Sequence, residues 1–176
     1  MGFPSQHCRK FIISFFLPIL LELFCLSSHT CSELKKALLL EGGNTDGTVS
    51  SVTLSKIYDA MAQAGLEAGL LREIPPWYRA AIAANPSVGI FHSHYAQYWE
   101  AVGDITAAEK QHLEAIEVES SDFQVWHYFA KFLANTKRFN ESMEAIKRAL
   151  QFVPNNRILL QDLAYVEELL GKGALH

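Results

Sequence analysis

The chain has 176 residues, of which 49% are hydrophobic and 19% are charged, and its net charge is −4. This apolar content excludes a disordered charged tail, and the acidic balance provides no overall positive field that would attract nucleic acid. The three cysteines all lie in the first 31 residues. The rest of the chain therefore can form neither a disulfide nor a thiolate zinc site.

The first element is an apolar run over residues 11–26 that follows two basic residues. A basic start, an apolar run and small polar residues are typical of a secretory signal peptide. The run is shorter than the roughly 20 residues that a helix needs to cross a membrane. Three interpretations stay open: a cleaved signal, an uncleaved anchor and the hydrophobic terminus of a cytosolic chain. Residues 1–31 are therefore assigned to a signal peptide or membrane anchor, with membrane contact through residues 11–26.

A short helical pattern, SELKKALLLE, comes next and ends at the turn-forming run GGNTDG. Residues 32–54 are predicted to form a short helix and a flexible linker. The boundary of the folded domain is placed near residue 54.

The remaining chain repeats every 34 residues, in windows that begin at Ser55, Gly89, Phe123 and Arg157. Alanine recurs at position 8 of the windows, as Ala62, Ala96, Ala130 and Ala164, and at position 27, as Ala81, Ala115 and Ala149. Two antiparallel helices need such small residues where they cross closely. Apolar residues spaced by three and four also give each window amphipathic helical faces.

This pattern resembles the tetratricopeptide repeat (TPR) superfamily over residues 55–176. The resemblance rests on the period of 34, an aromatic residue at position 4, Ala at 8, Gly-Asp at 15 and 16, Ala at 27 and Pro at 32. It implies an all-α fold, a right-handed α-α superhelix (TPR-like solenoid) preceded by the hydrophobic N-terminal helix and linker. The repeats would span 55–88, 89–122 and 123–156, with a capping helix over 157–171.

The first window departs from the family pattern. Gly65 stands where a large residue is usual, and Pro75 and Pro76 fall inside the expected second helix. We expect this helix to start late, with Pro76 in its first turn, where the missing N–H does no harm. The half-a-TPR repeat of RNA-processing scaffolds is the nearest rival, but Trp99 and Leu133 stand where that repeat usually has a glutamate.

No phosphate-binding loop, nucleophile elbow or zinc-protease signature is present. We therefore predict no enzyme activity, no catalytic residue, no cofactor and no metal site. His92 and His112 are expected to face each other, bonded to each other or to Tyr95. A metal site there would need a third ligand, for which only Asp104 and Glu109 are close in the repeat.

A row of carboxylates follows the second helix of the second repeat: Glu109, Glu114, Glu117, Glu119 and Asp122. Such a row is usually a solvated outer face, and an acidic docking patch is the sharper alternative.

The resemblance also implies a concave groove that holds a protein or peptide ligand. Its lining positions on the first helices are occupied by Ile90, Ser93, His94, Gln97, Gln124, His127, Tyr128, Lys131, Ile158, Gln161 and Tyr165. TPR proteins that bind chaperones clamp a C-terminal carboxylate with Lys, Asn and Arg, whereas the matching positions here hold Asp59, Gln63, Ser93 and Gln97. Asp59 would repel a carboxylate, which argues against that specialised function.

The predicted function is a non-catalytic protein-interaction scaffold or adaptor, tethered to or delivered through a membrane. The alternatives are a regulatory portion or short form of a membrane enzyme, such as a glycosyl-transfer protein, and the RNA-processing scaffold. A homodimer is possible, and nucleic acid is not an expected partner. The location is membrane-associated or in the secretory pathway, with the cytoplasm as the alternative; Asn140, in the sequon Asn140-Glu141-Ser142, is a candidate glycosylation site.

Overall fold

The computed structural model describes residues 50–72 and 74–173, and within these ranges it contains helices without strands. The helices are α4 (Ser51–Glu67), α5 (Ile74–Ala84), α6 (Ile90–Val102), α7 (Ile105–Val118), α8 (Phe123–Asn135), α9 (Phe139–Phe152) and α10 (Arg157–Gly173). The predicted N-terminal hydrophobic helix, the three cysteines and residues 32–49 of the predicted helix and linker lie outside the described residues. Residues 51–54, which were assigned to the linker, belong to α4, so the folded domain begins before the predicted boundary near residue 54. No helix in the described ranges is long and apolar enough to span a membrane.

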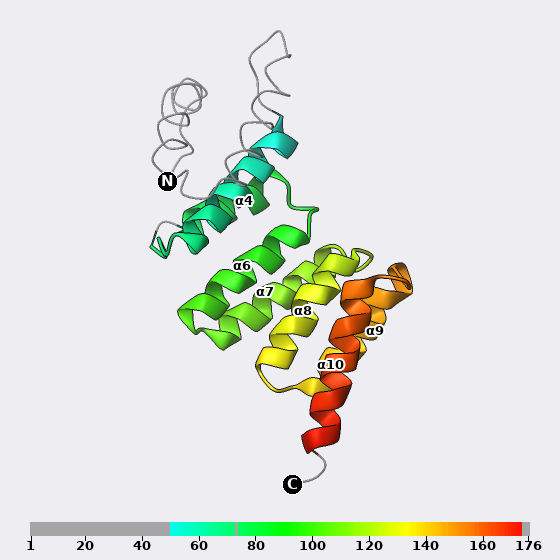
Figure 1. Cartoon of the computed structure of the whole chain (residues 1–176). Coiled ribbons are helices and arrows are strands. Elements are labelled where there is room, and N and C mark those ends of the chain that lie inside the picture. Colours follow the sequence, from blue (N-terminus) through cyan, green and yellow to red (C-terminus); the bar gives the residue numbers. More distant parts are fainter. Residues whose placement is uncertain (1–49, 73, 174–176) are drawn as a thin grey trace, which may run out of the picture.

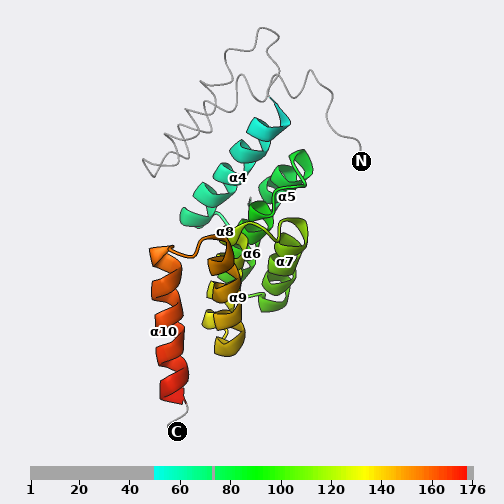
Figure 2. The same ribbon diagram turned by 90° about the vertical axis from the view of Figure 1, so that its right-hand side faces the viewer.

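The helices stack in chain order as pairs (Figure 1). The most extensive contacts join α4 to α5, α6 to α7 and α8 to α9, and α10 packs on α9. Figure 2 shows α4 and α10 on one side of the molecule and α5 and α7 on the other. The predicted all-α solenoid is confirmed, with α4, α6, α8 and α10 as the first helices of successive units.

The recurrent small residues lie at the helix crossings. Ala62, Ala96 and Ala130 at position 8 are at most 1% exposed, and the three alanines at position 27 are fully buried. Ala164 is exposed instead, because no helix after α10 covers it in the described part of the chain. The methyl-sized contacts predicted from the repeat are therefore made wherever a second helix is present.

The first helix of every pair ends in the same turn. The residue at position 15 is left-handed in all three pairs, with φ of 74° at Gly69, 89° at Gly103 and 63° at Lys137. The following amide donates to the carbonyl five residues earlier, at 2.9, 3.0 and 2.8 Å in the three turns. This is the Schellman motif, which satisfies carbonyls that a helix end leaves free.

The first helix pair, α4 and α5, contains the three residues that depart from the repeat pattern, Gly65, Pro75 and Pro76. Helix α5 begins at Ile74, so Pro75 and Pro76 fall in its first turn, as expected. A Cβ atom at Gly65 would lie 3.0 Å from the Trp77 ring and 3.2 Å from Ile74. Trp77 thus occupies the space that a larger residue at position 65 would need.

Two apolar clusters fill the interior. One is built around Ala62, Ile74 and Tyr78 from α4 and α5, together with tyrosines of α6; the other is built from α7, α8, α9 and α10. The half-buried Trp99 of α6 packs against both clusters. It is therefore the side chain that joins the two halves of the core.

Candidate functional site

The surface formed by α4, α6, α8 and α10, here called the first-helix face, is crossed by two carboxylate–histidine pairs. His94 Nδ1 lies 2.9 Å from Asp59 Oδ1, which joins α6 to α4. His127 Nε2 lies 2.7 Å from Asp162 Oδ2, which joins α8 to α10. Both pairs link position 5 of one repeat to position 6 of the next, because their members are 35 residues apart.

Asp59 is held inside this network rather than presented to solvent. It is 7% exposed, and its Oδ2 also accepts a hydrogen bond of 2.7 Å from Gln63 Nε2. The carboxylate that was expected to repel an acidic ligand is thus already engaged by two neighbours. Even so, the four positions of the chaperone clamp supply no cation.

Tyr128 connects the two pairs in the middle of the face. The His94 ring meets the Tyr128 ring edge-on, with centroids 5.4 Å apart, and His127 lies 6.4 Å from it. Burial raises the pKa of Tyr128, and the Asp59 charge adds to this rise. The two pairs and Tyr128 therefore form a continuous line of contacts from α4 to α10.

Two buried hydroxyl groups in this part of the fold lack hydrogen-bond partners. Ser93 at position 5 is fully buried, and neither its hydroxyl nor that of the buried Tyr78 of α5 makes a hydrogen bond. Burial, followed by the charges of Asp59 and Tyr128, raises the pKa of Tyr78 far above its ordinary value of 10.0. Ser93 was predicted to line the groove, but it does not reach the surface.

Other predicted groove residues are accessible. Ile158 and Tyr165 of α10 are 59% and 60% exposed, and Gln124, Lys131 and Gln161 are also exposed. Ile90 and Gln97 of α6 are half-buried. Accessible side chains therefore concentrate on α8 and α10.

A hollow of about 180 Å³ lies between α8 and α10, above α9. Two predicted residues line it, Lys131 and Tyr165, and the sequence interpretation missed Ala134, Asn135 and Asp162. A signal for Ala134 was present, because a small residue at lining position 12 leaves space at the surface. Asp162 is related to His127 by the same spacing that relates His94 to Asp59.

The histidines of the second repeat do not pair as expected. His92 Nδ1 lies 3.1 Å from Gln111 Oε1 and 3.4 Å from Glu114, while His112 Nε2 lies 3.2 Å from Glu100 Oε1. Their partners are thus neither each other nor Tyr95, and the nearby carboxylates are not Asp104 and Glu109. Among the described residues, no group of three or more His, Cys, Asp or Glu side chains could hold a metal ion.

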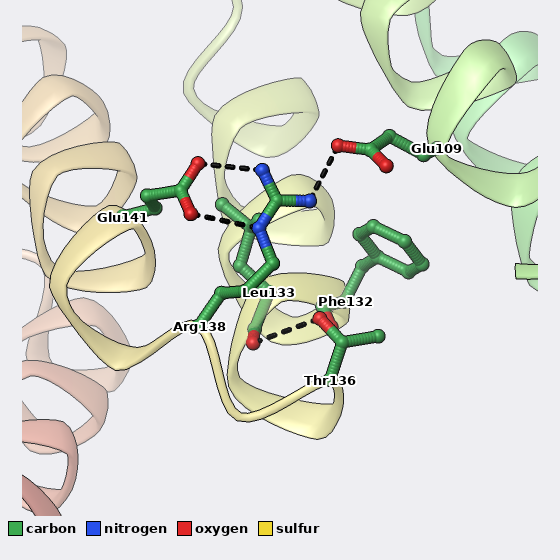
Figure 3. Close-up of polar contacts among 6 residues, drawn as sticks. All are labelled: Glu109, Phe132, Leu133, Thr136, Arg138 and Glu141. Carbon is green, nitrogen blue, oxygen red and sulfur yellow. Dashed lines mark hydrogen bonds and ion pairs between the residues drawn. The ribbon is translucent and has the colours of Figure 1, made fainter. Parts of the chain in front are cut away.

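The carboxylates on and after α7 are all at least partly exposed, as expected for an outer face, and most of them also make contacts within the fold. Glu119 accepts from the Gly89 amide at 2.9 Å, and Asp122 accepts from the Gln124 amide at the start of α8. Glu109 pairs with Arg138, which also binds Glu141 through two bonds of 2.7 and 2.5 Å (Figure 3). Glu117 remains exposed.

The candidate glycosylation site is accessible. Asn140 lies in the first turn of α9, not in the turn before it, and its side chain is exposed. The Ser142 hydroxyl of the same sequon is buried and donates to the Ala130 carbonyl at 2.8 Å.

The sequence matches no protein-family model, and it matches no curated protein. Solved structures, in contrast, resemble it closely in shape. The first TPR of Spaghetti (RPAP3) bound to an HSP90 peptide has a TM-score of 0.60 at 15% identity, and the match covers 68% of this chain and 98% of that one. PilF of Pseudomonas aeruginosa has a TM-score of 0.63 at 20% identity, covering 70% of this chain and 57% of that one.

The second TPR domain of human RPAP3, in complex with an HSP70 peptide, has a TM-score of 0.54 at 16% identity, covering 66% of this chain and 95% of that one. Likeness at such identities shows the fold. The described part of the chain therefore has the fold of three tetratricopeptide repeats followed by a capping helix.

Proposed function

We propose that this chain is a non-catalytic interaction scaffold that holds an extended peptide on its first-helix face. The observation that carries the proposal is the cluster of exposed polar and aromatic side chains of α8 and α10 around an apolar hollow. Extended segments bind such surfaces through side-chain hydrogen bonds and one or two apolar pockets. Two structures of similar fold contain bound peptides, SRMEEVD and SGPTIEEVD.

The peptide of this chain is not held by its C-terminal carboxylate. Both of those bound peptides end in Glu-Glu-Val-Asp, whereas the clamp positions here hold Asp59, Gln63, Ser93 and Gln97. Because none of these side chains is a cation, a terminal carboxylate would gain no charge-assisted hydrogen bond there. A segment bound through internal side chains fits the face better.

The proposal is tested by selecting peptides on the full-length chain from a random 12-residue library displayed on phage. Gln97 lies one helical turn after His94, so Gln97→Trp would place a bulky ring on the same face. We expect selected peptides to lose about tenfold or more in affinity for this variant. Gln151→Trp makes the same change on an exposed residue of α9 and should leave binding unchanged; equal binding to both variants would contradict the proposal.

We further propose that the scaffold acts at a membrane or within the secretory pathway, with the cytoplasm as the alternative. The proposal is supported by the apolar run over residues 11–26 and by the exposed Asn140. The test is the intact mass of the protein from a eukaryotic secretory host, with and without glycosidase. A chain shortened by about 25–30 residues with a removable glycan is expected; a full-length, unglycosylated chain would favour the cytoplasm.

A further inference from the structure

We propose that the hollow between α8 and α10 is the anchor site of the bound peptide and takes one aliphatic side chain with a carboxylate beside it. This inference rests on the proposed function and deepens it. The hollow is smaller than the roughly 300–1,000 Å³ of typical small-molecule pockets, and its size of about 180 Å³ suits a single side chain.

The floor of the hollow is apolar. Ala130, Ala134, Ile146 and Val166 line it. Ser142 also lies there, but its hydroxyl already donates to the Ala130 carbonyl. Since no polar atom of the floor is left to be satisfied by a ligand, an apolar occupant is favoured over a polar one.

The rim sets the charge of the occupant. Two charged side chains line the hollow, Lys131 and Asp162, and Asp162 is already paired with His127 at 2.7 Å. Lys131 is exposed and forms no ion pair with another described residue. A carboxylate next to the buried aliphatic group would therefore meet an ammonium group that has no ion-pair partner among the described residues. A basic residue would meet that ammonium group and a carboxylate that already binds His127.

Two further residues of the rim, Tyr165 and Asn135, are exposed and accessible to a bound peptide. Tyr165 is 60% exposed at the edge, and exposed tyrosines that become covered on binding often contribute strongly to affinity. Asn135 brings an exposed amide to the same rim. The ligand class is thus a peptide containing Leu, Ile or Met adjacent to Asp or Glu.

The experiment repeats the library selection on the full-length chain and on two variants. Lys131→Glu reverses the rim charge at an exposed position, and Ala134→Leu fills the hollow. Lys147→Glu, an equal charge change on an exposed residue of α9 outside the hollow, is the matched control. Circular dichroism confirms that each variant is folded, and the exposed Lys131 position keeps the test valid if Ala134→Leu unfolds.

We expect wild-type selections to be enriched in an aliphatic residue adjacent to Asp or Glu. A synthetic peptide of that sequence should bind Lys131→Glu about tenfold more weakly, and Lys131→Glu should itself select basic residues at the acidic position. Ala134→Leu should lose the aliphatic preference, and Lys147→Glu should behave as wild type.

The outcomes separate this inference from the proposed function. Selected peptides that lose affinity for Gln97→Trp but bind Lys131→Glu and Ala134→Leu normally would overturn the anchor site alone. Failure to select any peptide would overturn both. A dimer of the chain that Lys131→Glu dissociates would assign the hollow to a second copy and also overturn the peptide anchor.

Discussion

Lys137 adopts a backbone conformation that suits glycine. Its φ of 63° matches the turns where Gly69 and Gly103 stand, and a left-handed residue with a Cβ atom costs roughly 1–2 kcal/mol. We expect Lys137→Gly to raise the free energy of unfolding by about 0.5–1 kcal/mol, after the loss of chain entropy that glycine brings. Gly103→Ala should lower it by about 1 kcal/mol. Urea unfolding followed by circular dichroism measures both changes, and a destabilised Lys137→Gly would contradict the argument.

The raised pKa of Tyr78 predicts that the fold loses stability in alkali. Burial raises its pKa above the ordinary 10.0, so above pH 10 the unfolded chain releases this proton while the folded chain retains it. Stability is complete below pH 10 and falls as the pH rises further. Tyr78→Phe also removes a buried hydroxyl without a partner, so at pH 7 we expect at most about 1 kcal/mol of change.

The measurement is the free energy of unfolding between pH 8 and 11. The alkaline fall should be shallower in Tyr78→Phe than in the wild type. Tyr165→Phe, which removes an exposed hydroxyl, is the matched control, and an equal flattening in both variants would refute the assignment to Tyr78.

At the scale of the elements, Arg138 ties the start of α9 to α7 across the turn after α8 (Figure 3). Its hydrogen bonds lower the pKa of Glu141 below the ordinary 4.5. The contact is therefore complete above pH 4.5 and is lost as the pH falls through the lowered pKa. In Arg138→Gln, an NMR titration of the Glu141 carboxyl should give a pKa shifted upward, toward 4.5; an unchanged pKa would exclude Arg138 as the cause.

The helices could be predicted from the sequence because their signals are local. Alanine spacing, the Gly103-Asp104 break and the prolines of α5 each act within one or two turns of helix. The contacts across the first-helix face could not, because they depend on the offset between neighbouring helices. A period of 34 would place Asp59 opposite Ser93, but the structure pairs Asp59 with His94, one residue further along.

Burial was also hard to anticipate on this face. Ser93 and His94 are adjacent in the sequence, yet Ser93 is fully buried while His94 is half-buried and pairs with Asp59. The hollow at Ala134 depends on three helices at once. Such features follow from how the helices pack, which the spacing within one repeat does not determine.

At the scale of the whole molecule, Trp99 packs against both core clusters, so we expect it to couple their unfolding. We expect Trp99→Ala to cost about 3 kcal/mol and to separate unfolding of α4 and α5 from that of the C-terminal helices. Trp77 packs against the first cluster and Trp126 against the second, so each reports on its own half by fluorescence. Trp77→Phe and Trp126→Phe backgrounds isolate the two signals, and coincident transitions in Trp99→Ala would disprove the coupling.

The carboxylate–histidine pairs also depend on the order of the repeats. Asp precedes His at the first junction, from Asp59 to His94, and His precedes Asp at the last, from His127 to Asp162. Exchanging the second and third repeats would bring Asp59 against Tyr128, and His127 against His94. Both carboxylate–histidine pairs would then be lost, although each helix pair kept its own interior. The two pairs thus favour the native order of the repeats, and a chain with shuffled repeats would lose these contacts between neighbouring units.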